Sequence, residues 1–195
     1  MTPEELIAFE ADIAAEYNAG KIRYPVHLSG GNENQLIDIF KNFKKGDWVF
    51  STWRNHWHAL LAGIPKEEVK RQIMAGRSMT VSSVEHNFFS SAIVAGCCPI
   101  ALGVAWALKR QGSENKVWLF LGDMAACTGI AHECRNYAVM HDLPLRIVIE
   151  DNGKSVCTYT GVTWGKSQYV MANCDYYHRY VLPWPHAGAG QRIQF

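Results

Sequence analysis

The chain has 195 residues, 48% hydrophobic and 12% aromatic, which is enough to bury the core of one domain. Its 19 Lys and Arg residues balance 18 Asp and Glu residues without a basic block, so we expect no nucleic-acid partner. The longest apolar run, residues 92–108, is interrupted by Gly and Pro, and the N-terminus is not signal-like, so we expect no membrane role and a cytoplasmic location.

The first helix is predicted from its N-terminal residues. Thr2, Pro3 and Glu5 have the spacing of an N-cap, a proline at the first helical position and a capping box. An apolar stripe follows and stops before Gly20, so we expect a helix over residues 2–18. Further helices are predicted at residues 34–43, at 66–74 and, as one long apolar helix with a bend or start near Pro99, at 88–109.

The second half has the pattern of a strand, a helix and a strand. Residues 116–121 and 145–150 are continuous apolar strands, and residues 129–141 between them are helical. Such a crossover makes its two strands parallel, so that their carboxyl ends lie on one edge of the sheet. We expect one domain over 1–195, divided into the ranges 1–45 (N-terminal helices), 46–160 (binding core) and 161–195 (aromatic C-terminal tail).

A polar residue follows each of these two strands. Asp123 comes after the first strand and Asn152 after the second. Ligands of α/β sheets bind at the carboxyl edge, where an Asp and an Asn can both give oxygen atoms to a hard cation. The alternative is that Asp123 only caps a helix and that Asn152-Gly153 only forms a turn. The spacing alone favours this alternative.

The six cysteines are predicted to be reduced thiols in core or boundary positions, because no signal segment precedes them. Cys97 and Cys98 lie in an apolar run, which favours packing. A metal cluster of Cys127, His132 and Cys134 is conceivable, but no second ligand pair follows at the spacing of a zinc site.

Three ordered segments carry a family resemblance. They are "GDMAACTGIAHECRNYAVMHDLPLRIVIEDN" (122–152), "WRNHWHALLAG" (53–63) and "HNFFSSAIVAGCCPIALGVAWALK" (86–109). The first resembles the thiamine diphosphate motif, which opens with Gly-Asp-Gly and closes with Asn-Asn. The second is similar to a Tyr-Arg-x-His segment, and the third to the segment that passes the cofactor's aminopyrimidine. Together they resemble α subunits of 2-oxo acid dehydrogenases and the related transketolase group. The resemblance implies an α/β fold of three layers (α/β/α) with a mainly parallel sheet, the thiamine diphosphate-binding fold.

The resemblance also implies a set of binding residues. By position in the motif, Asp123, Asn152 and the backbone carbonyl of Lys154 would ligate Mg²⁺, which commonly binds through a carboxylate and substrate phosphate oxygens. The residues implied to bind the cofactor are Trp53, Arg54, Ala92, Val94, Gly122, Asp123, Met124, Ala125 and Asn152. Two of them depart from the family pattern, since Trp53 replaces tyrosine and Met124 replaces the second glycine.

Candidate catalytic residues come from the same segments. The resemblance places His56 at the reacting end of the thiazolium ring. Glu85 and His86 are assigned to the substrate pocket, because this hydrophilic pair precedes an apolar helix. The alternative for His56 is a packed histidine of the core or of an interface.

The family resemblance further implies a partner. In that family the glutamate that activates the cofactor comes from a pyrimidine-binding domain, and no segment here resembles one. We therefore expect a β subunit that supplies this domain and glutamate, in an α2β2 assembly acting on a small-molecule keto substrate. The family's longer α subunits continue into a histidine-bearing loop that is absent here. Either His178 or His186 replaces that histidine, or the aromatic tail packs on the partner.

Several functions stay open at this point. The first is acyl or ketol transfer by a transketolase-like or acyloin-forming enzyme, and its alternative is the oxidative decarboxylation of a 2-oxo acid. A non-catalytic cofactor-binding subunit is a further possibility. An ordinary nucleotide-binding α/β domain is disfavoured, because the glycine-rich fingerprints of such domains are missing.

Overall fold

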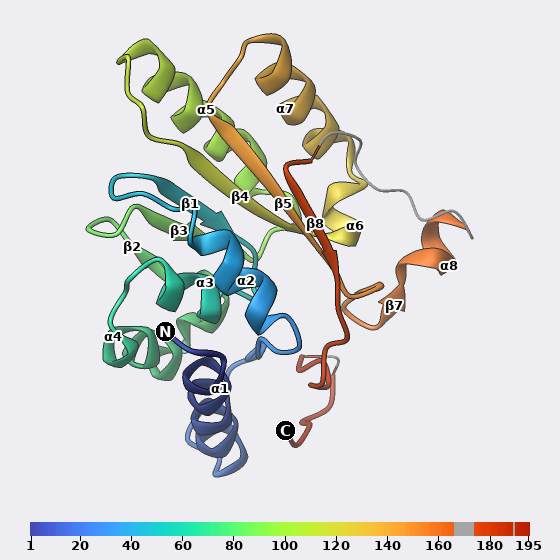
Figure 1. The fold of residues 1–195 in the computed structure, drawn as a ribbon. Helices are drawn as coiled ribbons and strands as arrows, with labels where there is room; N and C mark the ends of the chain where they lie inside the picture. Colours follow the sequence, from blue (N-terminus) through green and yellow to red (C-terminus); the bar gives the residue numbers. More distant parts are fainter. Residues whose placement is uncertain (166–173, 189) are drawn as a thin grey trace.

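The computed structural model describes residues 1–165, 174–188 and 190–195 (Figure 1). Its helices are α1 (Pro3–Asn18), α2 (Glu33–Phe40), α3 (His56–Leu61), α4 (Lys66–Gln72), α5 (Cys97–Arg110), α6 (Asp123–Ala126), α7 (Gly129–Met140) and α8 (Thr160–Trp164). Its strands are β1 (Trp48–Ser51), β2 (Ser82–Ser83), β3 (Phe88–Ser90), β4 (Val117–Gly122), β5 (Leu145–Asp151), β6 (Lys154–Ser155), β7 (Thr158–Tyr159) and β8 (Tyr176–Arg179). Short π-helical and 3₁₀ turns, Ile73–Arg77 and Ser78–Thr80, follow α4.

A mainly parallel sheet runs through the molecule in the order β2-β3-β1-β4-β5-β8. Neighbouring strands from β3 to β8 are parallel, and the short β2 is antiparallel to β3. Strands β4 and β5 pair from Val117↔Leu145 to Gly122↔Glu150, so they end together. The predicted strand–helix–strand unit with two parallel strands is confirmed, and it places Asp123 and Asn152 at one edge of the sheet.

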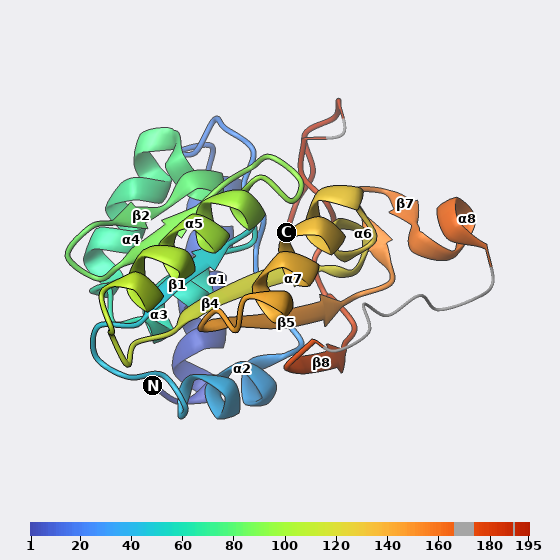
Figure 2. The ribbon, with the colours of Figure 1, turned by 90° about the horizontal axis from the view of Figure 1, so that it is seen from above.

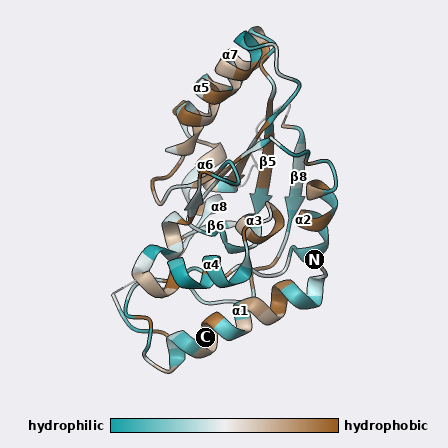
Figure 3. Cartoon of the chain, turned by 90° about the vertical axis from the view of Figure 1, so that its left-hand side faces the viewer, coloured by the Kyte–Doolittle hydropathy of each residue, from teal (hydrophilic) through white to brown (hydrophobic). Residues whose placement is uncertain are grey.

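Helices cover both faces of this sheet (Figure 2). The helices α1 to α4 bury their apolar side chains with Trp118 and Phe120 of β4 on one face. On the other face α5 and α7 lie side by side, and the fully buried Ala101 and Ala105 let α5 approach the sheet closely. Figure 3 shows the hydrophobic residues along α5 and the hydrophilic outer side of α4. The predicted three-layer α/β/α fold is therefore confirmed.

The elements with clear end signals form where the sequence predicts them. In α1 the hydroxyl of Thr2 accepts a hydrogen bond from the Glu5 backbone at 3.3 Å, and the Glu5 carboxylate accepts one from the Thr2 backbone at 2.7 Å. This is the predicted capping box. The bounds of β4, α7 and β5 agree with the predicted ranges 116–121, 129–141 and 145–150 to within a residue.

The long helix predicted over residues 88–109 is wrong in its first part. Residues 88–90 form β3, which pairs with β1, and α5 begins only at Cys97. Ala95, at φ 56°, turns the chain just before the helix. Pro99 lies in the first turn of α5, where a backbone N–H would have no acceptor within the helix. A proline at this position therefore removes no helical hydrogen bond. An apolar run without clear periodicity does not reveal this change from strand to helix.

The predicted helices at 34–43 and 66–74 form with earlier ends, at Phe40 and Gln72. The aromatic C-terminal tail is in part integrated into the fold, because β8 adds to the sheet beside β5. Trp184 and Phe195 pack against the core on the side of α1, where the Trp184 indole donates to the Ser29 carbonyl at 2.9 Å. In the described part of the chain, none of the helices has the length and apolar character needed to span a membrane.

Candidate functional site

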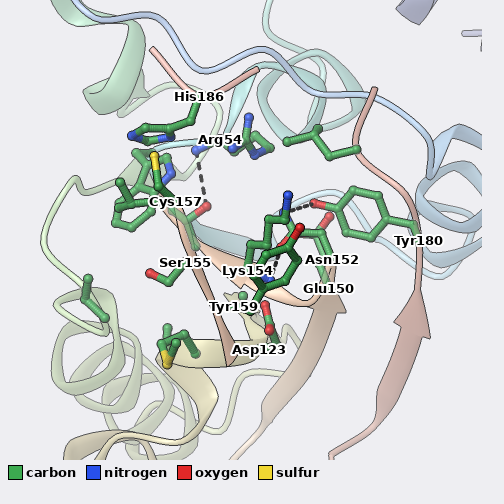
Figure 4. A pocket seen from close by; sticks show the side chains of 18 of the residues that line it. Arg54, Asp123, Glu150, Asn152, Lys154, Ser155, Cys157, Tyr159, Tyr180 and His186 are labelled. Atoms are coloured by element: carbon green, nitrogen blue, oxygen red, sulfur yellow. Dashed lines mark hydrogen bonds between the residues drawn. The ribbon is translucent and has the colours of Figure 1, made fainter. Parts of the chain in front are cut away.

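A pocket of about 520 Å³ opens where the parallel strands end (Figure 4). Its walls come from the segments that follow β1, β4 and β5, from the loop before α5 and from the C-terminal segment after β8. In the view of Figure 4, Arg54 and His186 lie at one end and Asp123 at the other, with Asn152 and Lys154 between them. The position matches the crevice in which ligands of α/β sheets bind.

The two predicted metal-ligating side chains meet in this pocket. Asp123 is the first residue of α6 and is only 8% exposed, and its Oδ2 accepts a hydrogen bond from the hydroxyl of Thr160. Burial raises the pKa of Asp123 and nearby Asp151 adds to this, while the Thr160 bond acts in the opposite direction. The Oδ1 atom of Asn152 accepts from the backbone N–H of Lys154 at 3.0 Å. One carboxylate and one amide therefore offer oxygen atoms to the same space.

Asp151, the last residue of β5, does not line the pocket. Its Oδ1 accepts from the Gly153 backbone at 2.8 Å, and its Oδ2 accepts from the Tyr177 hydroxyl at 2.6 Å. Burial and this carboxylate raise the pKa of Tyr177 to about 12. The amide of Asn152 donates to the hydroxyl of Tyr180 at 3.4 Å, so strand β8 and the residue after it hold the loop after β5 in place.

Positive side chains also line the pocket. They are Arg54, Lys154 and Arg179. The Arg54 guanidinium donates through Nη1 to the Leu28 carbonyl at 2.6 Å, which fixes its orientation. Burial lowers its pKa, and Tyr180, Glu10 and Glu150 act against that shift. A guanidinium stays protonated in proteins, so the pocket has a charge distribution suited to an anionic ligand.

A pair of stacked histidines stands beside Arg54. The rings of His27 and His186 have centroids 4.6 Å apart at an angle of 22°, and His186 lines the pocket. Burial, with Arg54 next, lowers the pKa of His27 to about 3 and moves the pKa of His186 in the same direction. The Nδ1 atoms of both rings are buried without a hydrogen-bond partner among the described residues. Both rings are thus expected to be neutral at pH 7.

Glu150 lies at the pocket but is already engaged. Its Oε2 is 3.1 Å from His58 Nε2, and its Oε1 accepts from the amide of Asn32 at 2.7 Å. Burial works to raise the pKa of Glu150, but His58, His178 and Asn32 together bring it below its usual value. The Nδ1 of His58 in turn lies 2.7 Å from the Ser51 hydroxyl. This network stabilises an ionised carboxylate at the floor of the pocket.

The structure does not place His56 in the pocket. Its ring is 0% exposed, with Nδ1 3.0 Å from a Glu10 carboxylate oxygen and Nε2 2.9 Å from the Ser78 hydroxyl. The expectation that His56 faces the reacting end is therefore wrong in position. Because α3 begins at His56, the chain turns there and directs this side chain into the helical layer. The buried pair with Glu10 instead joins α3 to α1.

Glu85 and His86 also lie away from the pocket. They occupy the turn between β2 and β3, at the amino end of β3, whereas the pocket lies at the carboxyl ends of the parallel strands. The His86 Nδ1 is 2.8 Å from the Ser83 hydroxyl, within the same turn. Their assignment to the substrate pocket is contradicted, because the hydrophilic pair belongs to a hairpin turn. Ala92 is not part of the lining either, although its neighbour Val94 is.

The remaining predicted cofactor and metal residues are brought together. The predicted residues that line the pocket are Trp53, Arg54, Val94, Gly122, Asp123, Met124, Ala125, Asn152 and Lys154. The individual roles of these residues stay predictions. Lining residues that sequence reasoning missed include Arg179, Tyr180 and His186, which no spacing rule connects to the motif. A metal cluster at Cys127, His132 and Cys134 is not found, since the described residues contain no such group of three His, Cys, Asp or Glu side chains.

Comparison with known proteins identifies relatives of the chain. A family model described as "Dehydrogenase E1 component" matches residues 2–173. The chain is 34% identical to "Pyruvate dehydrogenase E1 component subunit alpha" of Porphyra purpurea, over 74% of this chain and 47% of that protein. It is 31% identical to the protein of the same name from Rickettsia prowazekii (strain Madrid E), over 88% of this chain and 53% of the relative. The chain spans about half the length of these curated relatives. The chain belongs to the dehydrogenase E1 component family.

Proposed function

We propose that this chain is the diphosphate-binding α subunit of a thiamine diphosphate-dependent 2-oxo acid dehydrogenase. Its family and the names of its relatives support this assignment. They favour the oxidative decarboxylation that the sequence analysis gave as the alternative over the acyl or ketol transfer that it gave first. The observation that carries the proposal is the meeting of Asp123 and Asn152 in a pocket that Arg54, Lys154 and Arg179 also line.

The residues of the pocket fit the predicted ligands chemically. Mg²⁺ prefers oxygen donors and is usually held by one or two carboxylates together with phosphate oxygens and water. Asp123 supplies a carboxylate, Asn152 an amide oxygen and Lys154 a backbone carbonyl at the same strand edge. Arg54 is suited to hold the diphosphate, because a planar guanidinium binds phosphate through two hydrogen bonds. When bound, the cofactor supplies the electron sink for the loss of the carboxyl group of a 2-oxo acid.

The carboxylates of the pocket support a partner subunit as part of the proposal. Among the described lining residues, Asp123 and Glu150 are the acidic ones. Asp123 is assigned to the metal, and Glu150 is held by His58 and Asn32. Neither is free to bond the aminopyrimidine ring. We therefore assign the activating glutamate to a β subunit, in an α2β2 enzyme.

The proposal is tested by replacing the metal ligand. The Asp123→Ala variant is expected to bind thiamine diphosphate at least about tenfold more weakly in the presence of Mg²⁺, because the diphosphate charge loses its bridging cation. Isothermal titration calorimetry measures the affinity, and circular dichroism checks that the fold is intact. The matched control is Asp38→Ala, an exposed acid on α2 that pairs with Lys41 away from the pocket. Wild-type affinity in Asp123→Ala would remove the basis of the assignment.

The reaction class needs a second assay. The chain is combined with its β subunit and offered a panel of 2-oxo acids and a panel of ketose phosphates. We expect decarboxylation of a 2-oxo acid. Turnover of ketose phosphates alone would favour transketolase-like chemistry, and cofactor binding without any turnover would favour the non-catalytic alternative.

A further inference from the structure

A small flap follows strand β5 beside the predicted metal site. It comprises residues 153–165, which include the hairpin β6–β7 and helix α8. None of the residues in α8 is buried, and the helix stands out from the rest of the molecule in Figures 1 and 2. Glycines with positive φ bound the flap at both ends, Gly153 at 72° and Gly165 at 83°. These conformations suit glycine and allow the chain to turn sharply at both ends.

Helix α8 touches the body of the protein at the pocket through two side chains. The hydroxyl of Thr160 donates to Oδ2 of Asp123, and the indole N–H of Trp164 donates to the sulfur of Met124 at 3.0 Å. Both contacts end on adjacent residues at the carboxyl end of β4. One of these residues is the predicted magnesium ligand, and the other follows it in the diphosphate-binding motif.

The hydroxyl of Thr160 does not cap the N-terminus of its own helix. Thr160 is the first residue of α8, the N-cap is Tyr159, and no side chain caps the helix N-terminus. Its backbone N–H donates to the Gly153 carbonyl at 3.0 Å, which closes the flap onto itself. The hydroxyl reaches instead across the pocket edge to Asp123. Its contact is therefore specific to that carboxylate.

A carboxylate that accepts a hydrogen bond at one oxygen keeps the other oxygen for a cation. Hydrogen bonds of this kind orient metal-ligating carboxylates, and their loss typically weakens metal binding about 10- to 100-fold. We propose that Thr160 is a positioning residue for Asp123 and that it couples the placement of the flap to the metal site. This inference rests on the proposed function, because it takes Asp123 as a magnesium ligand.

The test compares two variants of Thr160 in the full chain. Thr160→Val removes the hydroxyl at nearly constant volume, and Thr160→Ser restores it. With saturating thiamine diphosphate, the dissociation constant for Mg²⁺ is measured by calorimetry. We expect it to rise about 10- to 100-fold in Thr160→Val and to stay within about twofold of wild type in Thr160→Ser. Thr158→Val, an exposed threonine on β7, is the matched control and is expected to bind like wild type.

Tryptophan fluorescence gives an independent readout of the flap. Addition of Mg²⁺ and cofactor is expected to change the emission of wild type, and Trp164→Phe identifies the part of that change that comes from Trp164. This part is expected to be lost in Thr160→Val and kept in Thr160→Ser. Unchanged or tighter Mg²⁺ binding in Thr160→Val would overturn the inference while leaving the proposed function in place. Wild-type binding by Asp123→Ala would overturn both.

Discussion

At the scale of single residues, Arg54 combines charge with a fixed orientation. One guanidinium nitrogen is bound by the Leu28 carbonyl at 2.6 Å, so the others are presented in a defined direction. Arg54→Lys keeps a positive charge but loses the planar guanidinium that can form two hydrogen bonds to one phosphate, and Arg54→Ala loses both the charge and these hydrogen bonds. We expect the affinity for thiamine diphosphate to fall about tenfold for Lys and about 100-fold for Ala, in line with the value of hydrogen bonds to charged groups. Calorimetry measures all three proteins, and equal affinities would contradict a role for Arg54 in diphosphate binding.

His27 makes stability depend on pH. Burial holds its pKa near 3 in the folded protein, against 6.5 for an ordinary histidine. Between these values the unfolded chain binds a proton that the folded protein does not, so stability decreases as the pH falls below about 6.5. The slope from this one group is at most about 1.4 kcal/mol per pH unit. His27→Phe keeps an aromatic ring and should flatten the dependence.

The measurement is urea unfolding at several pH values between 4 and 7. The comparison is His141→Gln, which also removes one histidine, at the exposed end of α7. If His27→Phe had the same pH dependence as wild type, another group would be responsible.

The sequence predicted which residues lie together where a motif is continuous and each strand end fixes a direction. Asp123 and Asn152 lie together because two parallel strands end in register. His56 was misplaced because closeness in sequence to Arg54 does not determine the side of a helix on which a side chain lies. Thr160 carries no signal of its own, since its contact with Asp123 joins residues far apart in the chain.

At the scale of elements, Asp47 ties the starts of β1 and β4 together. It is 1% exposed and accepts hydrogen bonds from the Lys116 backbone at 2.8 Å, the Trp118 indole at 2.9 Å and the Lys44 backbone at 3.1 Å. Asp47→Asn would set an amide N–H₂ against some of these donors. We expect the free energy of unfolding to fall by about 2–3 kcal/mol. Urea denaturation followed by circular dichroism measures it.

The control for this variant is Asp38→Asn on the exposed face of α2, which should change stability by less than about 1 kcal/mol. An equally small effect of Asp47→Asn would mean that the three donors find other acceptors.

Elements were predictable when local signals agreed with the fold. Capping residues and apolar periodicity are enough to predict α1 and α7, and unbroken apolar runs are enough to predict β4 and β5. The strands β1 and β8 are four residues each, and they exist because neighbouring strands offer hydrogen-bond partners. The helix predicted over residues 88–109 was wrong in its first part, because an apolar run is compatible with both a strand and a helix until tertiary pairing selects one.

At the scale of the whole molecule, the pocket has an exposed apolar rim. Ile93 is 73% exposed and Val94 is 45% exposed, and both line the pocket.

We expect the chain alone to bind thiamine diphosphate and Mg²⁺ without activating the cofactor, because the proposed glutamate lies on the β subunit. Hydrogen–deuterium exchange at the thiazolium carbon, followed by NMR in rapidly quenched samples, measures activation. It should be slow with the chain alone and fast after the β subunit is added.

A denatured sample of the chain is the control for non-specific exchange. Fast exchange with the folded chain alone would place an activating carboxylate within it, with Glu150 of the pocket as the first residue to replace.

The order of the strands has a consequence for how the chain folds during synthesis. Strand β1 lies between β3 and β4, and its residue Trp48 pairs with Val117. The helices α1 to α4 precede β4 in the chain, so the ribosome synthesises them first. Their apolar side chains pack on Trp118 and Phe120 of β4, which is synthesised later. Parallel pairing over such separations is slow to form, and apolar surfaces remain exposed in the meantime. We expect nascent chains that stop before β4 to need chaperones, and folding to become cooperative only once β4 has left the ribosome.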